Sequence, residues 1–341
     1  MTPANPTLRP IGGFIGLEPA SPPPPRPADF GAPHVLKFWN ARAALAHLLR
    51  AREVRRVWLP AYICLAPAEA AAEDGCEVAY YGVGGDLAPD VEQLSAGLAD
   101  GDAVLGIDYF GTPSLGLAAL ARSFPRVIWI QDRAQALWPD PAPWGGHLLY
   151  SPRKMVGAPD GGVLASLASG LPEPDWVPDR DLSRLEPTRL RAADPLGVAR
   201  ETWFPAYRAA EAAMTCEPRP ISQVSAEILD RLDVPAMAAQ RRRNAARLLG
   251  QVGDAALFGA DRLLAGAPLG VPVLTHDAAT VAVRMAEAGV YCARHWADLP
   301  SPAADFTAEH ALSRRLLTLP CDHRYADADM DRVAETFQRA R

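Results

Sequence analysis

Short apolar runs alternate with helical stretches between residues 35 and 166 of the chain. Runs of about five residues bounded by turn signals are typical of buried strands, and patterns of about ten residues are typical of helices. In chain order we predict a helix over Ala41–Ala51, a strand over Val57–Leu59, a helix over Pro67–Glu73, a strand over Glu77–Tyr81, a helix over Val91–Leu98, a strand over Ala103–Asp108, a helix over Leu115–Ser123 and a strand over Val127–Ile130. This alternation predicts a large, mostly parallel α/β sheet with helices on both faces.

The pattern becomes mainly helical after a predicted loop at Pro172–Arg180, which is rich in proline and acidic residues. Residues 181–250 are predicted to be helical, most clearly over Ile221–Leu232 and Pro235–Leu249. Proline suits the first turn of a helix and glycine often follows its end, so we expect the second of these helices to stop before Gly250.

A second, smaller α/β pattern follows Gly270. It predicts strands over Val271–Leu274, Val290–Ala293 and Leu316–Leu319, and helices over Ala278–Ala288 and Asp329–Arg339. The proline-rich stretch Ser21–Pro27 is predicted to be an extended connector behind a short N-terminal piece, Ile11–Glu18. We therefore divide the chain into an N-terminal segment with its connector, a large sheet domain, a helical bridge and a small C-terminal α/β domain, which cover residues 1–34, 35–180, 181–250 and 251–341.

Composition narrows the class of protein. The 341 residues suffice for two domains, and 49% hydrophobic and 22% charged residues are ordinary globular values. A net charge of −6 with dispersed arginines argues against a nucleic-acid partner, and we interpret the triplet Arg241–Arg243 as a solvent-facing side of a helix. No apolar run reaches the roughly 18 residues of a membrane span. Met1–Asn5 lacks the basic flank of a secretory signal, so we expect a cytoplasmic protein.

The five cysteines are Cys64, Cys76, Cys216, Cys292 and Cys321. Their number is odd, and their wide spacing lacks the close pairs that zinc and redox sites require. We therefore expect reduced thiols, most of them buried, and no metal centre.

The most informative chemical pattern joins an acid to a lysine. Asp132 ends a predicted strand, and Lys154 lies in the irregular segment that precedes a Gly-Gly turn. Pyridoxal phosphate needs such a pair, because the lysine forms a Schiff base and the carboxylate keeps the pyridine nitrogen protonated. Lys154 would also be the base that moves protons, and Gln135 can reach the ring hydroxyl if the segment turns. The alternatives are a solvated surface lysine and an aspartate that only caps a helix.

Three further segments offer groups for the same cofactor. Asn40 can cap a helix that begins at Ala41, where free N–H groups bind phosphate well; the alternative is an ordinary capped helix. Tyr62 or Cys64, after a strand, can lie over the cofactor ring; the alternative is that both are core residues. Ser151 supplies a hydroxyl suited to a phosphate oxygen.

Together these segments resemble the DegT/DnrJ/EryC1/StrS family of sugar aminotransferases, a part of the fold-type I group of pyridoxal-phosphate enzymes. The resemblance covers nearly the whole chain. Its most specific part is Asp132–Ala136 followed by Lys154, because the first segment is close to the family's Asp-Ala-Ala-Gln-Ala. The other similar segments are Asn40–Leu45, Leu59–Cys64, Tyr109–Gly111, Ile221–Leu249 and Leu317–His323.

The resemblance implies a role for each of these residues. Lys154 would be the Schiff-base lysine, Asp132 the partner of the pyridinium and Gln135 the contact of the ring hydroxyl. The phosphate would be bound by Ala41, Arg42 and Ser151. It also implies a homodimer with shared active sites. The reaction would move an amino group, usually from glutamate, to a keto sugar on a nucleotide, for polysaccharide or glycosylated-metabolite assembly.

The chain departs from the family pattern at three places. Ser151 and Lys154 have two residues between them where the family has four, and Cys64 stands where an aromatic residue is common. Glu217–Ile221 lacks the asparagine of the family's Asn-x-Arg-Met motif. Relatives that dehydrate their substrates have histidine in place of the lysine, so Lys154 favours transamination. The remaining alternatives are a different substrate, lyase or dehydratase chemistry with the same cofactor, and a non-catalytic relative.

Overall fold

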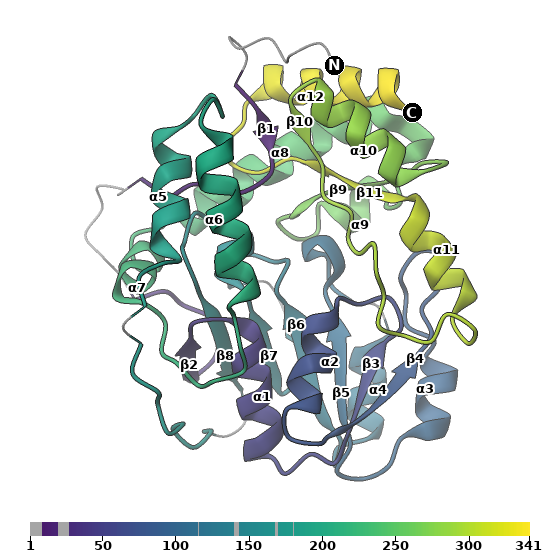
Figure 1. The fold of residues 1–341 in the computed structure, drawn as a ribbon. Helices are drawn as coiled ribbons and strands as arrows, with labels where there is room; N and C mark the ends of the chain where they lie inside the picture. Colours follow the sequence, from purple (N-terminus) through teal and green to yellow (C-terminus); the bar gives the residue numbers. More distant parts are fainter. Residues whose placement is uncertain (1–8, 20–26, 115, 140–142, 168–169, 180) are drawn as a thin grey trace.

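A seven-stranded sheet forms the centre of the computed structural model, which describes residues 9–19, 27–114, 116–139, 143–167, 170–179 and 181–341 (Figure 1). The predicted connector lies outside these ranges except for Pro27. From edge to edge, the strands of the sheet are β2 (His34–Phe38), β8 (Gly162–Ser166), β7 (His147–Tyr150), β6 (Ile128–Arg133), β5 (Ala103–Ile107), β3 (Arg56–Pro60) and β4 (Glu77–Tyr81).

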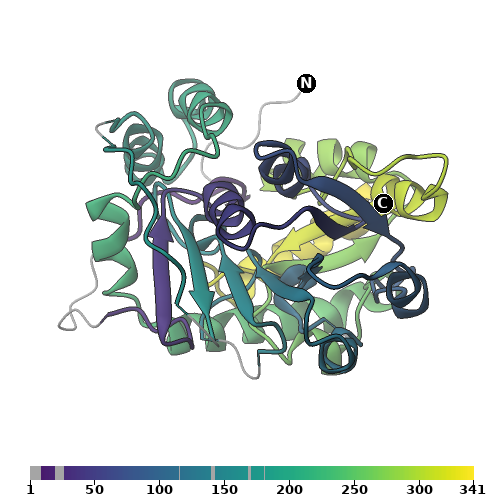
Figure 2. The same cartoon turned by 90° about the horizontal axis from the view of Figure 1, so that it is seen from below.

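The strands from β7 to β4 all run parallel, whereas β8 is antiparallel to both of its neighbours, β7 and β2. Crossover connections between parallel strands are right-handed, so the direction in which the chain moves along the sheet decides which face each helix covers. Helices α1 (Ala41–Ala51) and α2 (Leu65–Ala72) cover one face, and α3 (Val91–Gly97) and α4 (Leu117–Ser123) lie on the other (Figure 2). The predicted fold class, a mostly parallel sheet covered on both faces, is confirmed.

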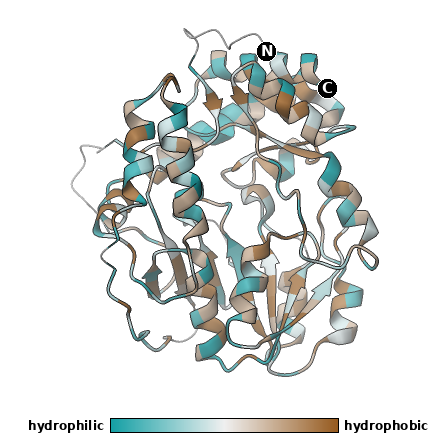
Figure 3. Ribbon diagram, viewed as in Figure 1, coloured by the Kyte–Doolittle hydropathy of each residue, from teal (hydrophilic) through white to brown (hydrophobic). Residues whose placement is uncertain are grey.

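Burial on both faces explains why the central strands are continuous apolar runs rather than alternating ones. Every residue of β5, β7 and β8 is buried, and Figure 3 shows hydrophobic residues concentrated in this sheet. Helix α1 begins where predicted because the Asn40 side chain accepts a hydrogen bond from the Ala43 amide at 2.8 Å.

The second half of the chain forms the helices and the two small sheets drawn above the large sheet in Figure 1. Its helices are α5 (Leu185–Ala193), α6 (Arg200–Ala212), α7 (Gln223–Leu229), α8 (Val234–Val252), α9 (Ala260–Leu263), α10 (Ala278–Glu287), α11 (Thr307–Arg315) and α12 (Asp327–Ala340). Strands β9 (Gly270–Leu274) and β11 (Leu316–Pro320) pair antiparallel, and β10 (Val290–Tyr291) pairs parallel with β1 (Ile11–Gly12). The N-terminal segment therefore joins the C-terminal part of the fold.

Several predictions need correction. No strand was predicted at β1, β2, β7 or β8, and β7 is only four residues long and has no alternating pattern. Helix α8 continues through Gly250 to Val252 and is capped by Gly253, whose φ of +55° suits glycine. Arg241 is fully buried rather than solvent-facing, because it lies on the side of α8 that packs against the rest of the fold.

The five cysteines are free thiols, and Cys76, Cys216 and Cys321 are buried, as expected. In the described ranges, no helix has both the length and the apolar character needed to cross a membrane.

We expect His147 in the central strand β7 to make the stability of the fold depend on pH. Burial lowers its pKa from 6.5 to about 4, Arg52 contributes in the same direction, and its Nδ1 has no hydrogen-bond partner among the described residues. Between these pH values the unfolded chain binds more protons than the folded one, so the free energy of unfolding should rise as pH increases from 4 to 6.5. This group contributes on the order of 3 kcal/mol across that window.

Urea denaturation at several pH values between 4 and 7.5 measures this effect. His147→Asn should flatten the rise, whereas His34→Asn, which changes an exposed histidine in β2, should leave it unchanged. An equal pH dependence in wild type and His147→Asn would contradict this assignment.

Candidate active site

The predicted chemical residues gather at one edge of the large sheet, where the parallel strands end. Ile107 at the end of β5 pairs with Asp132 of β6, and Asp132 pairs with Leu149 of β7. Lys154 follows β7 closely, at the end of the short 3-10 turn η2 (Pro152–Lys154). Parallel α/β sheets bind ligands at this edge, so the register places Asp132 and Lys154 at the usual position of a site.

The alternation of side chains along β6 separates two kinds of polar residue. Gln131 and Arg133 point to one face of the sheet, where both bind the buried Asp108 carboxylate, at 2.7 and 3.2 Å. Asp132 lies between them in the strand, so it points to the opposite face, the one covered by α1 and α2. Asp132 is therefore not part of the ion pair beside it in sequence.

Asp132 is a buried carboxyl whose hydrogen bond within the described part of the chain comes from the Ala134 amide, at 2.8 Å. Burial raises the pKa of Asp132, while the Lys154 ammonium and the Ala134 amide lower it and Asp108 raises it further. No helix begins at Asp132, so its predicted alternative role as a helix cap is wrong. A cationic group placed at this carboxylate would relieve the cost of its burial.

The backbone around Lys154 is held by contacts from distant parts of the chain. The Lys154 amide donates to the Ser151 carbonyl at 3.0 Å, and the side chain of its neighbour Arg153 pairs with Glu211 of α6 at 2.6 Å. The next residue, Met155, accepts a 2.6 Å hydrogen bond from the buried guanidinium of Arg241, which also donates to the Pro268 carbonyl at 3.1 Å. The segment that carries Lys154 is thus anchored to the C-terminal half.

The structure distinguishes the two residues proposed to lie over a cofactor ring. Cys64, before α2, lies within electrostatic reach of both Lys154 and Asp132: burial raises the pKa of its thiol, Lys154 lowers it and Asp132 raises it. Tyr62 is fully buried, and its hydroxyl donates to the His295 carbonyl. Its ring packs against Tyr109 and Trp296. Cys64 therefore lies within the electrostatic surroundings of Asp132 and Lys154, and Tyr62 contacts the C-terminal half of the chain through His295 and Trp296.

The start of α1 lies against the turn that follows Lys154. Both the oxygen and the nitrogen of the Asn40 side chain are engaged, since the nitrogen also donates to the Thr215 carbonyl at 3.0 Å. The Arg42 guanidinium donates to the Met214 carbonyl and pairs with Glu69 at 3.0 Å. The amides of the first turn have no acceptor within the helix, so Ala41 and Arg42 could hold an anion through their backbone rather than through a side chain.

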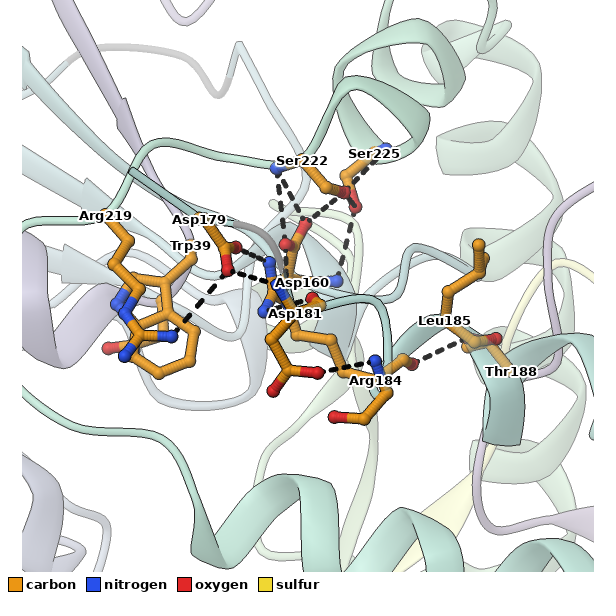
Figure 4. A network of polar contacts seen from close by, with 12 residues as sticks. Trp39, Asp160, Asp179, Asp181, Arg184, Leu185, Thr188, Arg219, Ser222 and Ser225 are labelled. Atoms are coloured by element: carbon orange, nitrogen blue, oxygen red, sulfur yellow. Dashed lines mark hydrogen bonds and ion pairs between the residues drawn. The ribbon is translucent and has the colours of Figure 1, made fainter. Parts of the chain in front are cut away.

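A buried polar network fixes this helix start in place (Figure 4). The Asp160 carboxylate accepts from Arg184 at 2.8 Å and from the Ser222 hydroxyl at 2.9 Å, and Arg184 also pairs with Asp179. Trp39, which precedes the helix cap, makes cation–π contacts with the guanidinium groups of Arg184 and Arg219, which lie 5.2 and 4.8 Å from its ring centre.

Backbone contacts complete the attachment between the helix start and the turn. The Gly161 amide donates to the Trp39 carbonyl at 2.7 Å. A Cβ atom at Gly162 would lie 2.0 Å from the carbonyl carbon of Asn40, so only glycine allows the turn and the start of α1 to approach this closely.

Two other predicted residues have defined positions. Gln135 is buried, and its Oε1 accepts a 2.7 Å hydrogen bond from the Phe110 amide. The oxygen of its side-chain amide is therefore engaged within the fold. Ser151 is buried between β7 and η2.

A cavity of about 780 Å³ opens onto Lys154. Its walls come from the N-terminal segment, from η2, from helices α5 and α6 and from the segment that follows β10. Lys154 is among the residues that line this cavity, whereas Asp132 and Cys64 are not. His295 lines the cavity, and its pKa falls to about 4 because of burial and of the nearby Lys154 charge. Its ring contacts Thr318 at 2.9 Å and is neutral near pH 7.

Several residues of this site were not predicted. Three residues near Lys154 come from parts of the chain more than eighty residues away: His295, Trp296 and Arg241. No local sequence pattern identifies them as site residues. One signal was present in the composition. The sequence contains only two lysines, Lys37 and Lys154, among its 34 lysine and arginine residues. A lysine retained in a chain that otherwise uses arginine deserves a chemical explanation, because only lysine can act as an amine nucleophile.

Solved structures of similar fold include aminotransferases, although no family model and no curated protein matches the sequence. DesI, solved in the presence of its TDP-sugar product, is 20% identical, and the alignment covers 91% of this chain and 81% of that chain with a TM-score of 0.64. A DegT DnrJ EryC1 StrS aminotransferase from Brucella abortus is 18% identical, and the alignment covers 91% of this chain and 86% of that chain with a TM-score of 0.63. NtdA from Bacillus subtilis, solved with bound cofactor PMP, is 14% identical, and the alignment covers 91% of this chain and 74% of that chain with a TM-score of 0.64. These likenesses establish the fold.

Proposed function

We propose that the chain is a pyridoxal-phosphate-dependent aminotransferase that transfers an amino group to a keto sugar. The observation that carries this proposal is that the buried Asp132 carboxyl and Lys154 follow neighbouring parallel strands at the same edge of the sheet, within electrostatic reach of each other. The residues fit the cofactor at three points: a carboxylate without a cationic hydrogen-bond partner, an amine beside it, and a helix start with free amides.

Each residue has a defined task in this proposal. Asp132 would hold a proton on the pyridine nitrogen, and Cys64 would lie against the ring. The amides of Ala41 and Arg42, with Ser151, would bind the phosphate. Lys154 would take a proton from the carbon that carries the amino group and return it to the product. When bound, pyridoxal phosphate supplies a conjugated ring that accepts electrons from the substrate carbon.

Absorption spectroscopy tests the proposal directly. Protein mixed with pyridoxal phosphate should develop a visible absorption band, and glutamate should remove this band by converting the cofactor to its amine form. A protein that takes up no cofactor would rule the proposal out and favour a non-catalytic relative. A band that glutamate does not alter would favour a different substrate or different chemistry with the same cofactor.

The finer parts of the proposal rest on the family resemblance. The sugar would be carried on a nucleotide, the amino donor would be glutamate, and the product would enter a polysaccharide or a glycosylated metabolite. DesI, of similar fold, was solved with a TDP-sugar product. Incubation of the aminated protein with nucleotide-linked keto sugars, followed by mass spectrometry, identifies the acceptor.

A homodimer is also part of the proposal. Leu182, Leu196 and Val198, around α5 and α6, are 67%, 46% and 76% exposed, which is high for large apolar side chains. Sedimentation velocity should give twice the monomer mass, and charged substitutions at these positions should lower it.

We expect Gly162→Ala to weaken cofactor binding at least tenfold. The added Cβ would collide with backbone atoms of Asn40 and Ala41, so the start of α1 must move away from β8. Overpacking of this kind costs about 1–3 kcal/mol, or about tenfold to hundredfold in affinity if it falls on the bound state. Titration of the apoprotein with pyridoxal phosphate measures the dissociation constant.

Gly250→Ala is the matched control, because no atom lies within 4 Å of a Cβ at this position in α8. It should leave cofactor affinity unchanged and raise stability by up to about 1 kcal/mol. Equal cofactor affinity in the wild type and in Gly162→Ala would show that the phosphate binds elsewhere.

A further inference from the structure

The cavity beside Lys154 is strongly cationic in an otherwise acidic protein. Among its lining residues, six are arginine or lysine and two are acidic, whereas the whole chain has a net charge of −6. The two acids are already engaged, since Glu211 pairs with Arg153 and Asp322 pairs with Arg324. A cavity with this charge attracts anions.

Most of the buried cations in the wall have partners. Arg153 pairs with Glu211, Arg184 pairs with Asp160, and Arg241 donates to backbone carbonyls. The Nε atoms of Arg153, Arg241 and Arg294 are all buried without an acceptor. Arg294 differs from the other two because no atom of its guanidinium forms a hydrogen bond or ion pair with any described residue. Burying part of a cation without a compensating acceptor costs free energy, which a ligand could recover.

Arg294 also occupies the right place for recognition of a reacting molecule. It precedes His295, whose ring lies within electrostatic reach of Lys154. It lies near Tyr62, since its charge lowers the pKa of that hydroxyl while burial raises it. The Tyr62 hydroxyl binds the His295 carbonyl, and this contact holds the backbone next to Arg294 against the large sheet.

We propose that Arg294 is a specificity residue that binds an oxyanion of the molecule that reacts at Lys154. The planar guanidinium matches carboxylate and phosphate groups with two parallel hydrogen bonds. The oxyanion has two possible sources within the proposed function, on which this inference rests: the carboxylate of the amino donor and the phosphate of the sugar acceptor. Either source gives Arg294 the acceptor that the chain does not supply.

Titration calorimetry on the cofactor-loaded protein separates the two sources without requiring turnover. Glutarate is the probe for a carboxylate, and thymidine diphosphate is the probe for a phosphate. Arg294→Gln should weaken the binding of one of these probes by about tenfold to hundredfold, because a hydrogen bond to a charged group is lost. Arg294→Lys should recover part of that loss, since it keeps the charge but not the fork geometry.

Arg243→Gln is the matched control, because it removes the same charge from an exposed position on α8. It should bind both probes as the wild type does. Binding of both probes unchanged by Arg294→Gln overturns the inference, and so does a wild type that binds neither. The proposed function is judged separately, by the response of the absorption band to glutamate, so each idea can fail without the other.

Discussion

Lys154→Ala is expected to reduce amino transfer by at least about a thousandfold and to abolish the visible absorption band of the bound cofactor. The same amine would attach the cofactor and move the proton, and proton transfer by a positioned side chain alone contributes about 10²–10⁴-fold. Borohydride reduction followed by peptide mass spectrometry should place the cofactor on Lys154 in the wild type. Steady-state assays with glutamate measure the loss of rate.

The composition of the chain makes this experiment unusually clear, because Lys37 is the only other lysine. Lys37 lies in β2 and pairs with Asp230 at 3.7 Å on a partly exposed surface, where an ion pair contributes at most about 1 kcal/mol. Lys37→Ala should therefore keep both the band and the activity. Cofactor attached to Lys37, or full activity in Lys154→Ala, would refute the assignment of Lys154.

Asp132→Ala is expected to lower the rate of amino transfer by about 10²–10⁴-fold while the protein stays folded. The carboxylate is buried and would face the pyridinium, and breaking a buried ion pair costs about 3–5 kcal/mol, with 1.4 kcal/mol for each factor of ten in rate. Single-turnover measurements with glutamate at saturating cofactor separate this loss of rate from weaker cofactor binding.

Chemical rescue distinguishes this role from a structural one. A cofactor methylated at its pyridine nitrogen carries a permanent positive charge, so it should restore part of the activity of Asp132→Ala. Asp108→Asn is the matched control, because Asp108 is equally buried but binds Arg133 on the opposite face of the sheet. It should lower the free energy of unfolding, and the methylated cofactor should restore nothing. Absence of rescue in Asp132→Ala would argue against contact between this carboxylate and the ring.

Local pattern was sufficient for much of the large sheet. The alanine- and leucine-rich stretch predicted α1 from Ala41 to Ala51, and the structure has the same bounds. The alternation of strands and helices predicted the parallel order, because each short apolar run needs burial on both faces. The pairing of Ile107, Asp132 and Leu149 could not be read from the sequence, since it depends on which strands become neighbours.

Long-range contacts decided the rest. The Arg241–Arg243 triplet is polar in sequence, yet Arg241 is fully buried because three carbonyls from two distant segments surround its guanidinium. Gly250 has the residue type of a helix end but continues α8, which runs to Val252 and is capped by Gly253.

The sequence by itself determined the class of fold, the helix start at Asn40 and the presence of an acid at a strand end followed by a lysine in an irregular segment, since all three depend on residues close together in the chain. Only the tertiary structure decided what surrounds them: Cys64 within electrostatic reach of Lys154, His295 at the cavity wall, and next to it Arg294, whose guanidinium has no partner among the described residues. The physical reason is that hydrophobic periodicity records how one segment is buried, whereas a site forms where several segments are buried against one another.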